Sequence, residues 1–112
     1  MNFKISSGEL RHPIIIQEHK KIKDKEDFLT KYEWVDKLNT RAKVLNVRGE
    51  EYLQAQGVGS KIEKTFYIRA SRNTVITRKD RIVFKEQLYD IEYINDIEEV
   101  GIWLEIKAKR CE

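Results

Sequence analysis

The residues of this sequence that could take part in catalysis do not fall at spacings that assemble a catalytic site. Neither histidine, His12 or His19, has a cysteine or a carboxylate at the spacing of a metal site. Cys111, the single cysteine, is next to last in the chain and lies far in sequence from a base that could activate its thiol. The sequence therefore predicts no catalytic residue, no cofactor and no metal ion, and an enzyme is not expected.

Two acidic pairs and a glycine-rich segment are the remaining candidates for chemistry. Glu50-Glu51 falls at an expected helix start and Glu98-Glu99 in an expected turn, where helix capping and solvation explain them better than paired acid–base catalysis. Residues 57–60 read Gly-Val-Gly-Ser, but they lack the following Lys-Ser/Thr and the preceding strand of a phosphate-binding loop. The enzyme hypothesis therefore stays weak.

Basic residues gather in two segments, and these are the candidate binding sites. The first, a candidate interface or channel loop within residues 19–31, contains Lys20, Lys21, Lys23, Lys25, Phe28 and Lys31. The second, a candidate basic contact cluster within residues 69–81, contains Arg69, Arg72, Arg78, Lys79 and Arg81 with Asp80 as its single acid. Such arginines could contact phosphates or bridge carboxylates across a subunit interface, and the segment could also be a hairpin loop kept soluble by charge.

Charge and hydropathy limit the class of protein. Charged residues make up 37% of the 112 residues, yet the formal net charge is only +3, which indicates a surface of mixed sign rather than a dedicated nucleic-acid binder. The apolar runs are too short to cross a bilayer, and the first residues lack the apolar core of a secretory signal. One cysteine excludes a disulfide framework, so a reducing compartment is expected.

Alternation of apolar and polar residues predicts a mainly β chain with one short α-helix. The expected strands cover residues 13–17, 34–47 with a bend near 37–39, 62–70, 81–84, 89–93 and 102–109, and the expected helix covers residues 49–57. On the fifth strand, Tyr89, Ile91 and Tyr93 should share one face. Five to six short strands predict a small antiparallel barrel or sandwich, forming a single domain over residues 1–112.

Residues 19–31 fit no strand pattern, so we expect a polar, mobile insert there. It could be a solvated hairpin extension, or an arm that becomes ordered only against a partner.

Several short motifs follow one another in a characteristic order. They are the run from Gly8 to Gln17, Trp34 with Arg41-Ala42-Lys43-Val44, Gly49-Glu50-Glu51, the runs from Thr65 to Arg69, Ile76 to Ile82, Leu88 to Ile91 and Ile94 to Ile97, and the last strand from Ile102 to Lys109. In this order they resemble the phage head–tail adaptor proteins, also called head-closure or head-completion proteins, of long-tailed phages and prophages. The lysine-rich insert and the Glu-Glu-Val-Gly segment after Ile97 depart from the family pattern.

The resemblance implies a structural virion protein without catalysis. It implies a monomer in isolation that forms a ring beneath the portal after DNA packaging, extends or closes the DNA channel, and provides the tail attachment platform. Portal and tail or neck proteins would be its partners, with no membrane, in the neck of the virion or in the bacterial cytoplasm during assembly. Residues 19–31 would form the mobile loop that docks or gates in such rings. Residues 69–81 would face a neighbouring subunit, the channel or packaged DNA.

A small OB-like barrel that binds nucleic acid is the alternative hypothesis. It predicts salt-dependent binding of short single strands, lost when Arg72, Arg78 and Lys79 are neutralised.

Overall fold

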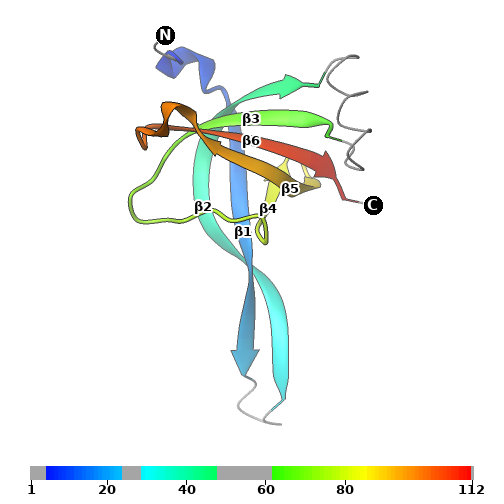
Figure 1. Ribbon diagram of the computed structural model, residues 1–112. Coiled ribbons are helices and arrows are strands. Elements are labelled where there is room, and N and C mark those ends of the chain that lie inside the picture. Colours follow the sequence, from blue (N-terminus) through cyan, green and yellow to red (C-terminus); the bar gives the residue numbers. More distant parts are fainter. Residues whose placement is uncertain (1–4, 24–28, 48–61, 112) are drawn as a thin grey trace.

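Antiparallel strands close into a six-stranded barrel in the computed structural model, which describes residues 5–23, 29–47 and 62–111 (Figure 1). The strands are β1 (His12–Lys23), β2 (Thr30–Asn46), β3 (Lys64–Arg69), β4 (Arg81–Phe84), β5 (Gln87–Asp96) and β6 (Trp103–Arg110), with short 3-10 turns η1 (Ser7–Glu9) and η2 (Ile97–Glu99). The order around the barrel is β1-β2-β3-β6-β5-β4, and β4 pairs back onto β1. The predicted mainly β fold is confirmed as a barrel, whereas the predicted helix at residues 49–57 lies outside the described residues.

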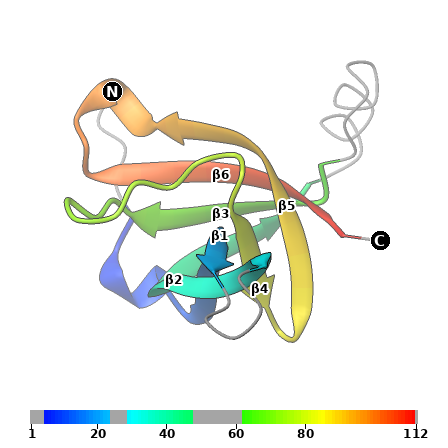
Figure 2. The same cartoon turned by 90° about the horizontal axis from the view of Figure 1, so that it is seen from below.

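The barrel interior is filled by β-branched and aromatic side chains from all six strands. The side chains that are fully or almost fully buried are Ile14, Ile16, Ala42, Phe66, Ile68, Ile82, Phe84, Tyr89, Ile91, Ile106 and Ala108. Phe66 lies at the centre, with ring centroids 5.7 Å from Phe84 and 5.6 Å from Tyr89 in edge-to-face arrangements. Figure 2, which looks at the barrel from below, shows the strands arranged around the barrel interior. The alternation of apolar and polar residues in the sequence therefore reflects strands that bury one face in the barrel interior.

A β-bulge bends β2 where the sequence predicted a bend. Ile16 pairs with Leu38 but the next residue, Gln17, pairs with Asp36, so Lys37 is the extra residue. A bulge of this kind increases the local twist and turns the strand. Beyond it, β1 and β2 leave the barrel together.

A second bulge changes the face on which the residues of β5 lie. Ile91 pairs with Ala108 and Tyr93 with Lys107, so Glu92 is the extra residue. The bulge turns Tyr93 outward, with 47% of its surface exposed, and places Ile94 against the core. The prediction that Tyr93 shares a face with Tyr89 and Ile91 is therefore wrong, because alternation continues only through an uninterrupted ladder.

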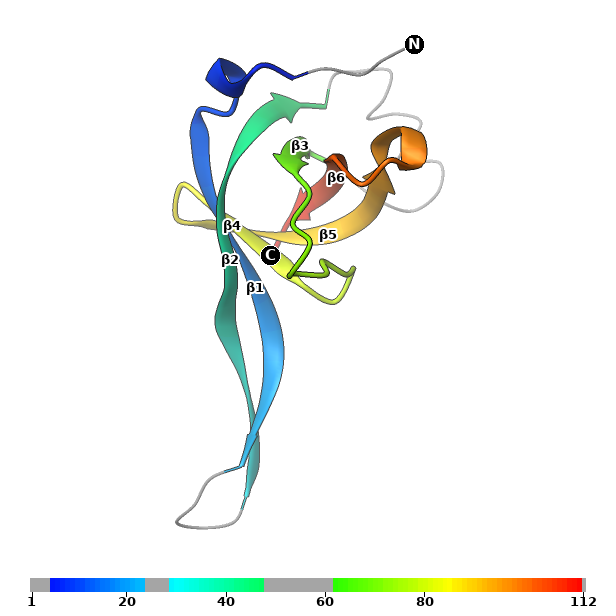
Figure 3. The same ribbon diagram turned by 90° about the vertical axis from the view of Figure 1, so that its left-hand side faces the viewer.

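The expectation that residues 19–31 fit no strand is also wrong for the part that is described. β1 continues to Lys23 and β2 begins at Thr30, and the pairing of β1 with β4 ends at Gln17. Residues 18–23 and 30–35 therefore form a hairpin arm that projects from the barrel (Figures 1 and 3). At 3.3–3.4 Å per residue the arm is about 20 Å long. Neither of its faces packs on the core, so the sequence has no need to alternate there.

The connection from β3 to β4 crosses the barrel instead of joining neighbours. β3 lies between β2 and β6, whereas β4 lies between β1 and β5. The interpretation of residues 69–81 as a hairpin loop is therefore wrong, and residues 70–80 are a crossover loop.

Candidate functional site

One face of the hairpin arm carries a row of aromatic side chains. His19 pairs with Trp34 across the two strands, and their rings stack with centroids 4.7 Å apart and an interplanar angle of 12°. Tyr32, two residues before Trp34, lies on the same face with its ring centroid 5.2 Å from that of His19. The Tyr32 side chain is 61% exposed and Trp34 is 36% exposed. Such amphipathic rings on a projecting element are suited to protein contact.

Arg81 at the start of β4 connects this aromatic face to the barrel. Its guanidinium carbon lies 4.1 Å from the centroid of the Trp34 ring, which is a close cation–π contact. Its Nε donates a hydrogen bond of 2.7 Å to Oε1 of Gln17, and Nε2 of Gln17 donates one of 2.9 Å to Oδ1 of Asp36. The base of the arm is therefore fixed by side chains from three strands.

A buried ion pair joins the crossover loop to the bulge of β2. Nζ of Lys37 donates to Oδ2 of Asp80 at 2.8 Å, and the backbone N–H of Thr77 donates to the same oxygen at 2.8 Å. The Asp80 side chain is only 4% exposed and Lys37 is 16% exposed. Glu18 lies farther away, with Oε2 3.8 Å from Nζ of Lys37. The single acid of the basic segment thus anchors the loop that carries the basic residues.

The predicted lysines of the first segment divide between the two faces of the arm. Lys21 and Lys23 alternate with His19 on the aromatic face, whereas Lys20 and Lys31 lie on the opposite face. All four side chains are exposed. The remaining predicted members of this segment, Lys25 and Phe28, lie outside the described residues.

The predicted arginine cluster does not form one group. The guanidinium carbon of Arg69, at the end of β3, lies 5.2 Å from the centroid of the Trp103 ring. The crossover loop carries Arg72, Arg78 and Lys79, which are exposed, and Arg81 belongs to the arm base. The structure therefore brings one predicted basic residue against the arm, and the role of the others stays a prediction.

Sequence reasoning missed the aromatic face of the arm and the buried ion pair. The spacing of Tyr32 and Trp34 by two residues, as on one face of a strand, was the available signal for the first. The Lys37–Asp80 pair joins residues 43 apart in sequence, and no local pattern indicates it.

The groups considered for catalysis have ordinary structural surroundings where they are described. Burial, together with a hydrogen bond to Asp90, raises the pKa of the Cys111 thiol to about 11, so that the thiol is protonated at neutral pH. The ring of His12 packs edge-on against Phe84 at 5.5 Å.

Within the described ranges no group of three or more His, Cys, Asp or Glu side chains could hold a metal ion. No described helix has the length and apolar character needed to cross a membrane.

Two solved structures have folds similar to that of this chain. One is the solution structure of protein SF1141 from Shigella flexneri 2a, with a TM-score of 0.72 and 21% identity over 95% of this chain and 96% of that one. The other belongs to the virion of a native gene transfer agent particle, with a TM-score of 0.56 and 16% identity over 91% of this chain and 96% of that one. At these identities the likeness establishes the fold.

The sequence assigns the family. Residues 5–110 match the phage head completion protein family, and the chain belongs to it. This is a structural, non-enzymatic family, so the chain is a structural component of the phage head. The resemblance stated from the sequence is thereby confirmed. The comparison with curated proteins gave no match.

Proposed function

We propose that this protein binds the portal as a ring, extends or closes the DNA channel, and provides the platform to which the tail attaches. The observation that carries the proposal is the family match over residues 5–110, because completing the head means finishing the vertex through which the genome was packaged. Portal, tail or neck proteins and further copies of the chain are then its partners.

The hairpin arm supports this proposal by its reach and its chemistry. It extends about 20 Å, and the molecule measures 54 Å along its longest axis against 32 and 25 Å along the others. Residues 18–23 and 30–35 contain four lysines and two glutamates beside the exposed aromatic rings. Rings need head-to-tail contacts between two different surfaces of the same subunit. An arm of this kind can reach a neighbouring subunit or the portal while the barrel keeps its place in the ring.

The crossover loop supplies a second surface for such a ring. Its exposed Arg72, Arg78 and Lys79 lie on a segment that Asp80 anchors to β2. Cations on an anchored loop can pair with carboxylates of a neighbouring subunit or with phosphates of DNA in the channel. We propose these residues as contacts of the assembled ring.

Assembly with the cognate portal tests the proposal. The isolated protein should be a monomer by light scattering, and mixing it with purified portal should give a ring stacked on the portal in electron micrographs. Trp34→Ala should weaken the complex tenfold or more, because aromatic residues of a projecting arm are typical interface hot spots. Tyr93→Ala is the matched control, since Tyr93 is 47% exposed on β5, outside the arm.

Two results would count against the proposal. One is the absence of any portal complex. The other is salt-dependent binding of short single strands without portal, lost on neutralising Arg72, Arg78 and Lys79, which would favour the nucleic-acid-binding alternative.

A further inference from the structure

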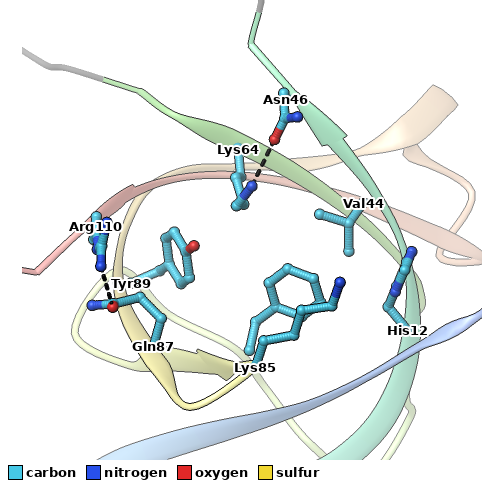
Figure 4. A pocket seen from close by; sticks show the side chains of 9 residues that line it. His12, Val44, Asn46, Lys64, Lys85, Gln87, Tyr89 and Arg110 are labelled. Carbon is cyan, nitrogen blue, oxygen red and sulfur yellow. Dashed lines mark hydrogen bonds between the residues drawn. The ribbon is translucent and has the colours of Figure 1, made fainter.

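A pocket opens at one end of the barrel beside the tight turn between β4 and β5 (Figure 4). Its volume is about 410 Å³, within the range of pockets that hold small molecules or a few peptide residues. The described residues that line it are His12, Val44, Asn46, Lys64, Phe84, Lys85, Gln87, Tyr89 and Arg110. Three of them are basic, His12 adds an imidazole, and none is acidic. None belongs to the hairpin arm.

The cations of this pocket are oriented by neutral partners. Nζ of Lys64 donates a hydrogen bond of 2.6 Å to Oδ1 of Asn46, and Nη2 of Arg110 donates one of 2.7 Å to Oε1 of Gln87 (Figure 4). An amide oxygen fixes the position of an ammonium or guanidinium group without neutralising its charge. The pocket therefore keeps a net positive field, and its cations are positioned before any ligand arrives.

The floor of the pocket is aromatic and buried. Phe84 is 6% exposed and Tyr89 is 5% exposed. The ammonium groups of Lys85 and Lys64 lie 5.3 and 5.9 Å from the centroid of the Phe84 ring. The Tyr89 hydroxyl points into the pocket (Figure 4).

Tyr89 can act as a hydrogen-bond donor in this pocket. Burial raises the pKa of its hydroxyl, Arg110 lowers it and Glu63, which does not line the pocket, raises it further. The net shift is upward, so the hydroxyl keeps its proton at neutral pH. It can donate to an acceptor that enters the pocket.

The turn that presents Lys85 is conformationally costly. Lys85 and Glu86 are the two residues between β4 and β5, and both have positive φ, 49° and 63°. A two-residue turn of this kind favours Asn-Gly, because other residues strain in the left-handed region. Unfavourable backbone conformations cluster at functional positions. Backbone preference alone would therefore favour Asn over Lys at position 85.

We propose that the barrel-end pocket binds a carboxylate carried next to a hydrocarbon group, in an acidic peptide segment of a partner protein where Glu or Asp adjoins an aliphatic residue. Arg110 offers the planar donor geometry that carboxylates prefer, and Lys64, Lys85 and the Tyr89 hydroxyl add further donors. The apolar floor accepts the hydrocarbon. A phosphate ion has no hydrocarbon group to place against such a floor.

Titration of the isolated chain with small organic probes tests each part of this proposal. Amide shifts in ¹H–¹⁵N spectra should report saturable, millimolar binding of hexanoate at residues of the pocket. Acetate should bind at least tenfold more weakly, because each buried methylene contributes about fourfold, and hexanol should not bind because it lacks the charge. An acetylated, amidated Leu-Glu-Leu peptide should bind at the same residues, and the Leu-Gln-Leu peptide should not.

The substitution Lys85→Asn separates a binding role from a structural one. It should weaken hexanoate binding about tenfold, the loss expected for one charge-assisted hydrogen bond, while the melting temperature stays equal or rises because Asn tolerates positive φ. Lys107→Asn removes the same charge from the outer face of β6 and should leave binding unchanged.

Absence of saturable hexanoate shifts, or equal affinity of the Lys85→Asn variant, would overturn the proposal. Tighter binding of inorganic phosphate or of a dinucleotide would overturn it in favour of a phosphate site. The titration needs no portal, so its result is independent of the ring proposed above.

Discussion

Removing the Asp80 carboxylate should destabilise this protein far more than removing an equally short ion pair at the surface. In Asp80→Ala, the Lys37 ammonium and the backbone N–H of Thr77 both lose an acceptor at 2.8 Å. The Lys37 side chain is 16% exposed, so water replaces the carboxylate only in part. The crossover loop also loses its attachment to β2.

The magnitude follows from burial. Breaking a buried pair by deleting one partner costs about 3–5 kcal/mol, since the other charge is left without compensation. The value here should lie near the lower end, about 3 kcal/mol, because Glu18 lies within reach of the stranded Lys37. For a domain of this size that corresponds to a fall in melting temperature of roughly 12–18 °C. Lys37→Met in the Asp80→Ala background should recover part of the loss, because it removes the stranded charge.

Equilibrium urea unfolding provides the measurement, and the chain offers a control. Lys43 and Glu9 form a pair of the same length, 2.8 Å, but their side chains are 36% and 41% exposed. Glu9→Ala should therefore leave the unfolding midpoint nearly unchanged. Equal midpoints for Asp80→Ala and Glu9→Ala would refute the reasoning that burial decides the strength of these pairs.

Two further predictions concern titratable groups. The pKa of the Cys111 thiol is raised from 9.0 to about 11, so at neutral pH the folded protein should hold about 100-fold less thiolate than the unfolded chain. Iodoacetamide should therefore modify Cys111 about 100-fold more slowly in the folded protein than in urea. Asp90→Asn should speed the reaction of the folded protein, and equal rates in the folded protein and in urea would contradict the raised pKa. The hydrogen bond from Lys43 lowers the pKa of Glu9 below its ordinary 4.5, so the attachment of η1 to β2 should be complete above that pH and lost as pH falls through the lower value. Amide shifts of η1 followed down to acid pH should show this transition, and an unchanged transition in Lys43→Met would contradict it.

Strands with one buried face could be predicted from the sequence, and strands without one could not. Arg81–Phe84 was predicted with its observed bounds because Ile82 and Phe84 alternate into the core. In the hairpin arm both faces are solvated, so no alternation of buried apolar and exposed polar residues marks its strands. The bulge at Glu92 could not be predicted either, because an extra residue in a ladder is defined by the pairing with the partner strand, here β6.

The candidate site was predictable in composition but not in arrangement. The charge-rich segments indicated which stretches face solvent. The contacts of Arg81 with Gln17 and Trp34 join positions 64 and 47 apart in sequence, and they exist because β4 closes the barrel against β1. The barrel-end pocket likewise combines His12, Lys64 and Arg110 from three strands. Only the closed topology brings such residues together.

The most direct test of the proposed function is electron microscopy of the protein mixed with its cognate portal. The proposal predicts a ring with the symmetry of the portal, stacked on it around the channel, with each hairpin arm contacting a neighbouring subunit or the portal itself. Trp34→Ala should reduce the fraction of portals that carry the ring, and Tyr93→Ala should not. Portals that remain bare at saturating protein would contradict the proposal.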